Sequence, residues 1–134
     1  MTEFPLKIVT PDGLRFDGSA EELIVRSSTG DVAILARHVN FVTSLGMGQA
    51  VIVSKGQRRT AACIGGMLSV VDGHVTLLPS TFEWSDQIDV ERADASYRRA
   101  DAVLHDKNAS ETDLKLAEAR LRRALIRKSV ASSK

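Results

Sequence analysis

Asp89 and Arg92 have the spacing that most clearly could bind a charged ligand. They stand at the head of a helix-like segment, in the run Ile88-Asp89-Val90-Glu91-Arg92-Ala93. Residues three apart lie on the same side of a helix, so the Arg92 side chain could touch the Asp89 carboxylate. One interpretation is a site for an anionic nucleotide, supported by Arg99 and by arginines of a returning helix. The other is that Asp89 is a helix N-cap that accepts backbone N–H groups and binds nothing else.

A second basic cluster lies further along the chain, within a segment that we expect to be the second helix. There Glu118 is the one acidic residue among Arg120, Arg122, Arg123, Arg127 and Lys128. Arginine predominates in this cluster, and its planar guanidinium forms forked contacts with carboxylates and phosphates. The cluster favours an acidic partner or a phosphate ligand, and the alternative is a solvated helix face.

Other residue types that could do chemistry are scattered. His38, His74 and His105 lie far apart without cysteines or carboxylates at metal-ligand spacing, so no metal site is expected. Cys63 stands in the strand-like run 61–64 and is expected to be a buried structural thiol. Gly46-x-Gly48 lacks the third glycine of a dinucleotide loop, and neither a phosphate-loop motif nor a nucleophile motif of the Gly-x-Ser-x-Gly kind is present. An enzymatic function therefore has little support.

Two architectures are predicted to position these residues. All 9 glycines and all 3 prolines of the 134 residues precede residue 80. Turn signals before that point separate short runs rich in Val, Ile and Leu, which is typical of a β-sandwich or barrel. We expect strands over 6–9, 22–25, 32–35, 50–53, 67–71 and 75–78. The predicted fold class is α+β, with an antiparallel β-sandwich over residues 1–84 and a two-helix hairpin over residues 85–134.

The hairpin is predicted from a change of period after residue 88. Val90, Ala93, Tyr97, Ala100 and Leu104 follow a helical stripe, and a second stripe is formed by Leu114, Ala117, Leu121 and Ala124. Between the stripes, Ser110-x-x-Asp113 has the form of a helix-starting capping box. The stripes contain few large apolar side chains, so we expect two antiparallel helices of about 17 residues, close to one another and weakly docked on the sandwich.

Charge and composition limit the partners and the cellular compartment that we expect for this chain. The formal net charge is +1, which gives no strong general case for nucleic acid as a partner. A nucleic-acid-binding hairpin is further disfavoured because Tyr97 is the one aromatic residue after Trp84. The single cysteine fits a reducing compartment, and no apolar run is long enough to span a bilayer. We therefore expect a soluble cytosolic protein.

The order of motifs along the whole chain resembles the epsilon subunit of the F-type ATP synthase. The resemblance rests on Leu6-Lys7-Ile8-Val9-Thr10-Pro11-Asp12-Gly13, on Gly30-Asp31-Val32-Ala33-Ile34-Leu35 running into His38, and on Ile64-Gly65-Gly66-Met67-Leu68 followed by 75–78. It implies a non-catalytic subunit of the central rotor, at the cytoplasmic face of the membrane. Its implied partners are the gamma subunit, the c-ring and, through an extended hairpin that inhibits ATP hydrolysis, the alpha/beta hexamer. No nucleic acid is implied.

Particular residues carry these implications. Asp31 and His38 match the loop that meets the c-ring in the family, although Ala36-Arg37 replaces the usual Pro-Gly before the histidine. No cofactor is implied as obligatory, but some bacterial members bind ATP as a regulatory ligand through an Ile/Leu-Asp-x-x-Arg-Ala motif, which this chain matches. The residues implied for ATP are Glu83, Ile88, Asp89, Arg92, Ala93, Arg99, Arg122, Arg123 and Arg127. An alternative from another class is a stand-alone ATP-sensing module.

Overall fold

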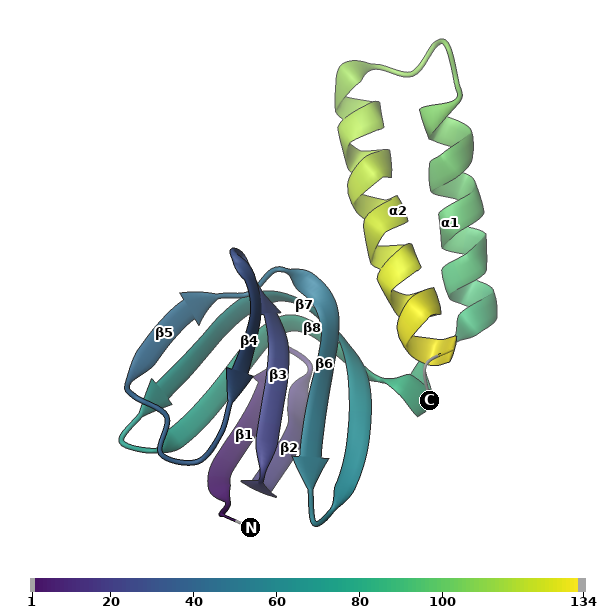
Figure 1. The fold of residues 1–134 in the computed structure, drawn as a ribbon. Coiled ribbons are helices and arrows are strands. Elements are labelled where there is room, and N and C mark those ends of the chain that lie inside the picture. The colour runs from purple at the N-terminus through teal and green to yellow at the C-terminus, as the bar shows by residue number, and fades with distance from the viewer. Residues whose placement is uncertain (1, 133–134) are drawn as a thin grey trace.

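Eight strands followed by two helices make up the computed structural model, which describes residues 2–132 (Figure 1). The predicted fold class, a β-sandwich followed by a helical hairpin, is confirmed. The strands are β1 (Phe4–Thr10), β2 (Gly13–Ala20), β3 (Glu22–Ser27), β4 (Gly30–Ile34), β5 (Phe41–Ser44), β6 (Met47–Ser54), β7 (Gln57–Val71) and β8 (His74–Trp84). A 3-10 turn, η1 (Ser85–Gln87), leads into α1 (Val90–Leu104) and α2 (Glu111–Ser132).

The long strand β7 connects the two layers of the sandwich. Residues 57–64 pair with β6, residues 67–70 pair with β5, and residues 61–71 pair with β8 except at Gly65. The order of the hydrogen-bonded strands is β2-β1-β8-β7-β6-β3-β4. The strand crosses between layers at Gly65 and Gly66, which both have positive φ, 67° and 100°. A side chain at Gly66 would place its Cβ 2.0 Å from the Leu78 carbonyl oxygen, so only glycine fits there.

One pair of strands departs from the antiparallel expectation. Leu6–Ile8 of β1 runs parallel to Val75–Leu77 of β8, whereas the other strand pairs within residues 2–132 are antiparallel. The physical reason is that these are the first and last strands of the sandwich. No hairpin turn joins them, so their relative direction is set by the path of the chain between them.

Two strands were absent from the expectation, and others differ in length. β2 has the sequence GLRFDGSA, of which only Ala20 is buried, and it lacks the apolar run that predicted the others. β5 has only four residues and alternates between half-buried and exposed. The expected strand over 32–35 ends one residue earlier, at Ile34, and Leu35 is exposed.

The main core fills the space between the two layers, and the helices contribute little to it. Its fully buried members include Leu6, Ile8, Leu23, Leu68 and Leu77, and Trp84 closes one end. In the hairpin, the predicted alanine stripe is confirmed, because Ala93, Ala100, Ala117 and Ala124 are all buried. Val90 is an exception, with half of its side chain exposed, and the helices are 15 and 22 residues long rather than about 17 each.

Both predicted helix starts form as expected. The Asp89 carboxylate accepts a hydrogen bond from the Arg92 backbone N–H at 3.0 Å. At α2, the Asp113 N–H donates to Ser110 Oγ at 3.0 Å, and the Ser110 N–H donates to Asp113 Oδ2 at 3.3 Å, which completes the capping box.

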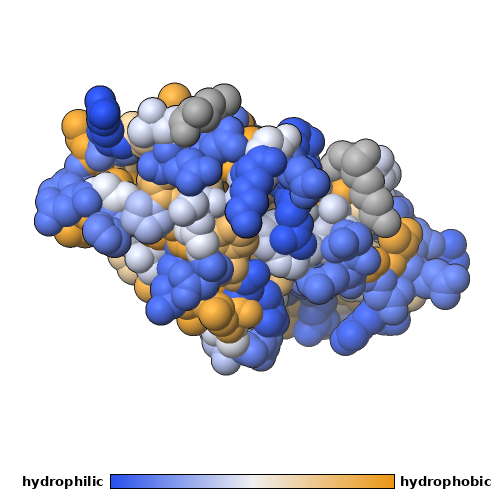
Figure 2. All heavy atoms as spheres, turned by 90° about the horizontal axis from the view of Figure 1, so that it is seen from below, coloured by the Kyte–Doolittle hydropathy of each residue, from blue (hydrophilic) through white to orange (hydrophobic). Residues whose placement is uncertain are grey.

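Only the C-terminal part of α2 packs on the sandwich, and the rest of the hairpin projects away from it (Figure 1). The contact is a small cluster of Ala62 from β7, Ile88 from the linker, and Val130 and Ala131 from α2, with Ile126 beside it. This cluster is separate from the main core, which accords with the expected weak docking. Seen from below, the molecule is mostly hydrophilic, with small apolar patches (Figure 2). Within residues 2–132, neither helix is long and apolar enough to cross a membrane.

Candidate functional site

A polar cavity of about 630 Å³ lies where the sandwich meets the hairpin, and we call it the junction cavity. The β1–β2 turn, the end of β8, the linker, α1 and α2 all contribute to its wall. It is lined by Thr10, Asp12, Arg15, Thr81, Phe82, Glu83, Gln87, Asp89, Arg92, Ala93, Ser96, Arg99 and Arg127.

Four arginines line this cavity, and one of them has a partner. Arg127 Nε donates to Glu83 Oε1 at 2.5 Å, with about one-third or less of each side chain exposed. The side chains of Arg15, Arg92 and Arg99 form no ion pair or hydrogen bond with any other residue in 2–132. Three guanidinium groups without a protein partner therefore face one cavity, and this arrangement suits a ligand with several negative charges.

The expected side-chain contact between Asp89 and Arg92 is not formed. The hydrogen bond between these residues runs from the Arg92 backbone, because the Asp89 carboxylate is occupied in capping α1. Within the part of the chain that the structure describes, no ion pair joins their side chains. The Arg92 guanidinium is left facing the cavity.

The structure brings most of the sequence-predicted ATP residues to this place. Glu83, Asp89, Arg92, Ala93, Arg99 and Arg127 line the cavity. Ile88 does not line it, because its side chain packs behind the wall in the docking cluster with Val130 and Ala131.

Arg122 and Arg123 do not line the junction cavity. Arg122 lies five residues before Arg127, which is about 140° around a helix of 3.6 residues per turn. It pairs with Glu118 at 3.1 Å and lines a different groove, between α2 and the β3–β4 turn. Arg123 lies one turn nearer the tip of the hairpin than Arg127.

Sequence reasoning missed the β1–β2 turn as a wall of the cavity. Thr10 Oγ1 donates to the Gly13 carbonyl and accepts from the Asp12 N–H, each at 3.1 Å, which fixes the turn. Pro11-Asp12-Gly13 was recognisable as a turn, but no local pattern connects it with a helix that begins 80 residues later. Ser96 was missed as well, because its position on α1 carries no distinguishing motif.

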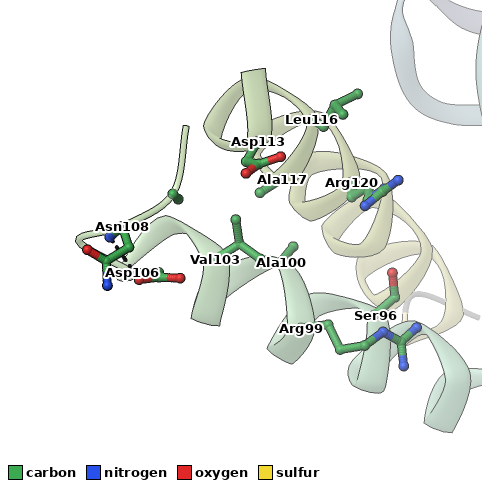
Figure 3. Close-up of a pocket in the computed structure, with 11 residues that line it drawn as sticks. Ser96, Arg99, Ala100, Val103, Asp106, Asn108, Asp113, Leu116, Ala117 and Arg120 are labelled. Atoms are coloured by element: carbon green, nitrogen blue, oxygen red, sulfur yellow. Dashed lines mark hydrogen bonds between the residues drawn. The ribbon is translucent and has the colours of Figure 1, made fainter. Parts of the chain in front are cut away.

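A second cavity, of about 580 Å³, lies between α1 and α2 toward the hairpin tip (Figure 3). Ser96 and Arg99 line both this cavity and the junction cavity, so Arg99 lies where the two adjoin. At its far end Asp106 accepts a hydrogen bond from the Asn108 N–H at 2.9 Å (Figure 3).

A charged cluster holds the two helices together on the other side of α1. Asp94 accepts from Lys128 Nζ at 3.0 Å and from Arg98 at 2.6 Å, and Lys128 also lies over the Tyr97 ring. The hydrogen bond from Lys128, followed by the charge of Arg98, lowers the pKa of Asp94. Like the buried alanine stripe, this cluster joins α1 to α2, but it does so through charged side chains.

Of the two residues predicted together as a c-ring contact, Asp31 is the second residue of β4 and His38 lies four residues after the last residue of that strand, Ile34. Asp31 is close to the β3–β4 turn, pairs with Arg26 at 3.0 Å and faces a groove shared with α2. His38 lies beyond the other end, in the exposed loop before β5, where its ring contacts Phe41. That loop is joined to the β7–β8 turn by a hydrogen bond from the Asp72 N–H to Asn40.

Two further sequence predictions concern the Cys63 thiol and metal binding. Cys63 is buried, as predicted, and burial raises the pKa of its thiol to about 12. Among residues 2–132, no group of three or more His, Cys, Asp or Glu side chains is arranged to hold a metal ion.

Comparison with known proteins places the whole chain in one family. Residues 3–85 match the ATP synthase delta/epsilon chain beta-sandwich domain, and residues 86–132 match its long alpha-helix domain. The ATP synthase epsilon chain of Ruminococcus albus is 42% identical over 135 residues, covering 100% of both chains. That of Bacillus velezensis is 38% identical over 133 residues, covering 99% of this chain and 100% of its relative.

Solved structures show the same fold at lower identity. A chain of the Euglena gracilis mitochondrial ATP synthase matches with a TM-score of 0.83 at 19% identity, covering 100% of this chain and 83% of that one. A chain of the Tetrahymena thermophila mitochondrial ATP synthase central stalk and c-ring matches with a TM-score of 0.62 at 13% identity, covering 97% of each. From the two matching domains and the full-length relatives, the chain belongs to the family of ATP synthase epsilon chains, non-catalytic accessory subunits of that complex.

Proposed function

We propose that the chain couples and regulates an ATP synthase as a rotor subunit, and that ATP bound in the junction cavity holds its hairpin folded. The observation that carries the regulatory part is the set of three arginines, Arg15, Arg92 and Arg99, that face this cavity without a protein partner. A ligand changes a conformational equilibrium only by its differential affinity for the two forms. The cavity exists only while the hairpin lies against the sandwich, so its ligand would favour that form.

The residues present fit ATP. The cavity volume of about 630 Å³ is within the range of small-molecule sites. The free guanidinium groups suit the phosphates, and Thr81 and Ser96 offer hydroxyl groups to a sugar or base. The Glu83–Arg127 pair fixes the wall where α2 meets β8.

An apolar face of the sandwich supports docking on the gamma subunit. Val42, Met67, Val71 and Leu78 each expose about half of their side chain. The strand registers place all four on the outer face of β5, β7 and β8, because Val42 is opposite Ser69 and Met67 is opposite Leu78. A row of exposed apolar residues on one sheet face is typical of a protein interface.

The exposed loop that holds His38 is our candidate for the c-ring contact, at the cytoplasmic face of the membrane. The membership of Asp31 in the same contact stays a prediction; Asp31 is the second residue of β4, and its carboxylate pairs with Arg26. Inhibition of ATP hydrolysis would involve α2, whose arginines could approach acidic loops of the alpha/beta hexamer once the hairpin extends.

Calorimetric titration of the full chain with ATP tests the regulatory part. We expect saturable heat in the parent chain, and an affinity reduced about tenfold or more in Arg92→Ala. Arg58→Ala is a matched control, because Arg58 is exposed on β7 and does not line the cavity. Absence of heat in the parent chain would refute ATP binding.

A separate experiment tests the coupling part. The chain should retain the purified gamma subunit in a pull-down, and Leu78→Asp should abolish retention without changing ATP binding. A parent chain that fails to bind gamma while still binding ATP would favour a stand-alone ATP-sensing module instead.

A further inference from the structure

Arg15 is placed in the junction cavity by an irregularity of the sandwich. In the β1–β2 pair, Ile8 is opposite Phe16 and the next residue, Val9, is opposite Leu14. Arg15 is therefore the extra residue of a β-bulge, with no residue facing it on β1. Bulges re-aim a side chain, and this one directs a half-buried arginine to the wall of the cavity.

The surroundings of the bulge hold it in place. On one side, the Thr10 hydroxyl ties the turn at Asp12 and Gly13. On the other, the Phe16 ring packs against the Trp84 ring, with centroids 6.4 Å apart. Arg15 thus stands on a rigid part of the sandwich, whereas Arg92 and Arg99 stand on α1.

No protein group within residues 2–132 neutralises the Arg15 side chain. Asp12 lines the same cavity and forms no ion pair with Arg15. A half-buried guanidinium without a partner loses hydration that a ligand phosphate can replace.

We propose that Arg15 binds a phosphate of the nucleotide in the junction cavity, so that one ligand is held by the sandwich and by the hairpin together. This inference rests on the proposed function and deepens it. It assigns to the sandwich a charged residue that binds phosphate, in addition to the Thr81 hydroxyl, and this explains why the bound ligand would keep the hairpin against the sandwich. A nucleotide bound by α1 and α2 alone could travel with the hairpin, whereas one bound also by Arg15 cannot.

The test compares ATP binding by the full-length parent chain, Arg15→Ala, Arg15→Lys and the control Arg58→Ala. We expect Arg15→Ala to lose about tenfold or more in affinity, Arg15→Lys to lose less because it keeps the charge, and Arg58→Ala to match the parent. Circular dichroism establishes that each variant is folded. If Arg15→Ala does not fold, Arg15→Gln, which keeps most of the side-chain length without the charge, takes its place.

Hydrogen exchange gives a readout that a merely structural role would not change. In the parent chain, ATP should slow exchange both in the β1–β2 turn and at the start of α1. In Arg15→Ala at saturating ATP, protection should remain in α1 and be lost in the turn. ATP binding by the parent with unchanged affinity in Arg15→Ala would overturn this inference and leave the proposed function standing. No ATP binding by the parent would overturn the proposed function itself.

Discussion

Replacing Ile88 by alanine should detach the hairpin while leaving the sandwich folded. Ile88 is 9% exposed and packs against Ala62, Val130 and Ala131, in a cluster separate from the main core. The change removes three carbon atoms from this cluster. At about 0.8 kcal/mol per buried carbon, the loss is about 2.4 kcal/mol, and small alanine neighbours cannot fill the space left behind.

The equilibrium between the docked and the undocked hairpin should therefore shift strongly toward the undocked form. A loss of about 2 to 3 kcal/mol lowers the docking constant roughly 30- to 150-fold, at a factor of ten per 1.4 kcal/mol. Few other apolar contacts hold α2 to the sandwich, so little compensates for it. The bonds within each strand pair are untouched, which is why the sandwich should keep its stability.

Hydrogen exchange followed by mass spectrometry measures how often the hairpin leaves the sandwich. Peptides covering residues 124–131 should exchange much faster in Ile88→Ala, and peptides from β7 and β8 should not change. Val90→Ala is the matched control, since Val90 is two residues away, is also β-branched and is half-exposed. If Ile88→Ala and Val90→Ala change exchange in 124–131 equally, the docking cluster does not hold the hairpin and the reasoning is wrong.

Three further predictions concern the helix clamp, the strand crossing and the cysteine. Because the pKa of Asp94 is lowered from 3.8, its contribution to the folded hairpin is present above that value and is lost as the pH falls through the lowered pKa. Asp94→Asn should therefore loosen α1 from α2 at neutral pH, seen as faster exchange in α1, and the difference from the parent should shrink in acid. Gly66→Ala should destabilise the sandwich by more than about 3 kcal/mol in thermal unfolding, because its Cβ would meet the Leu78 carbonyl, whereas Gly18→Ala, which has only ordinary contacts, should change little. Cys63 should resist alkylation at pH 8 in the folded chain and react once the chain is unfolded, because burial keeps its thiol protonated; rapid labelling of the folded chain would contradict its burial.

The helices were predictable from the sequence because their signals are local. The spacing of Ala93 and Ala100 defines a buried stripe within one helix, and Ser110 and Asp113 cap α2 through bonds between residues three apart. Such patterns are complete within a few turns of chain, so nothing distant is needed to interpret them.

The junction cavity could be predicted only in part, because its wall combines distant segments. The motif around Asp89 and Arg92 was recognisable in the sequence. The contribution of Arg15 was not, because it depends on a bulge in β2, and the sequence of β2 lacks the apolar run that predicts a strand. The grouping of Asp31 with His38 as one c-ring contact stays a prediction. The two residues are seven apart in sequence, with three residues of β4 and the start of the following loop between them, and the local pattern does not reveal the path of that loop.

The continuity of β7 has a mechanical consequence. In many sandwiches the two layers are joined mainly by side-chain packing and by loops, so a shearing load can slide one over the other. Here the backbone of β7 is paired with β6 in one layer and with β5 in the other. A load applied to the outer face of Met67 and Val71 therefore reaches the opposite layer through covalent bonds and a continuous hydrogen-bonded ladder. For the proposed rotor subunit, this would make the sandwich a stiff element, so that motion is confined to the hairpin.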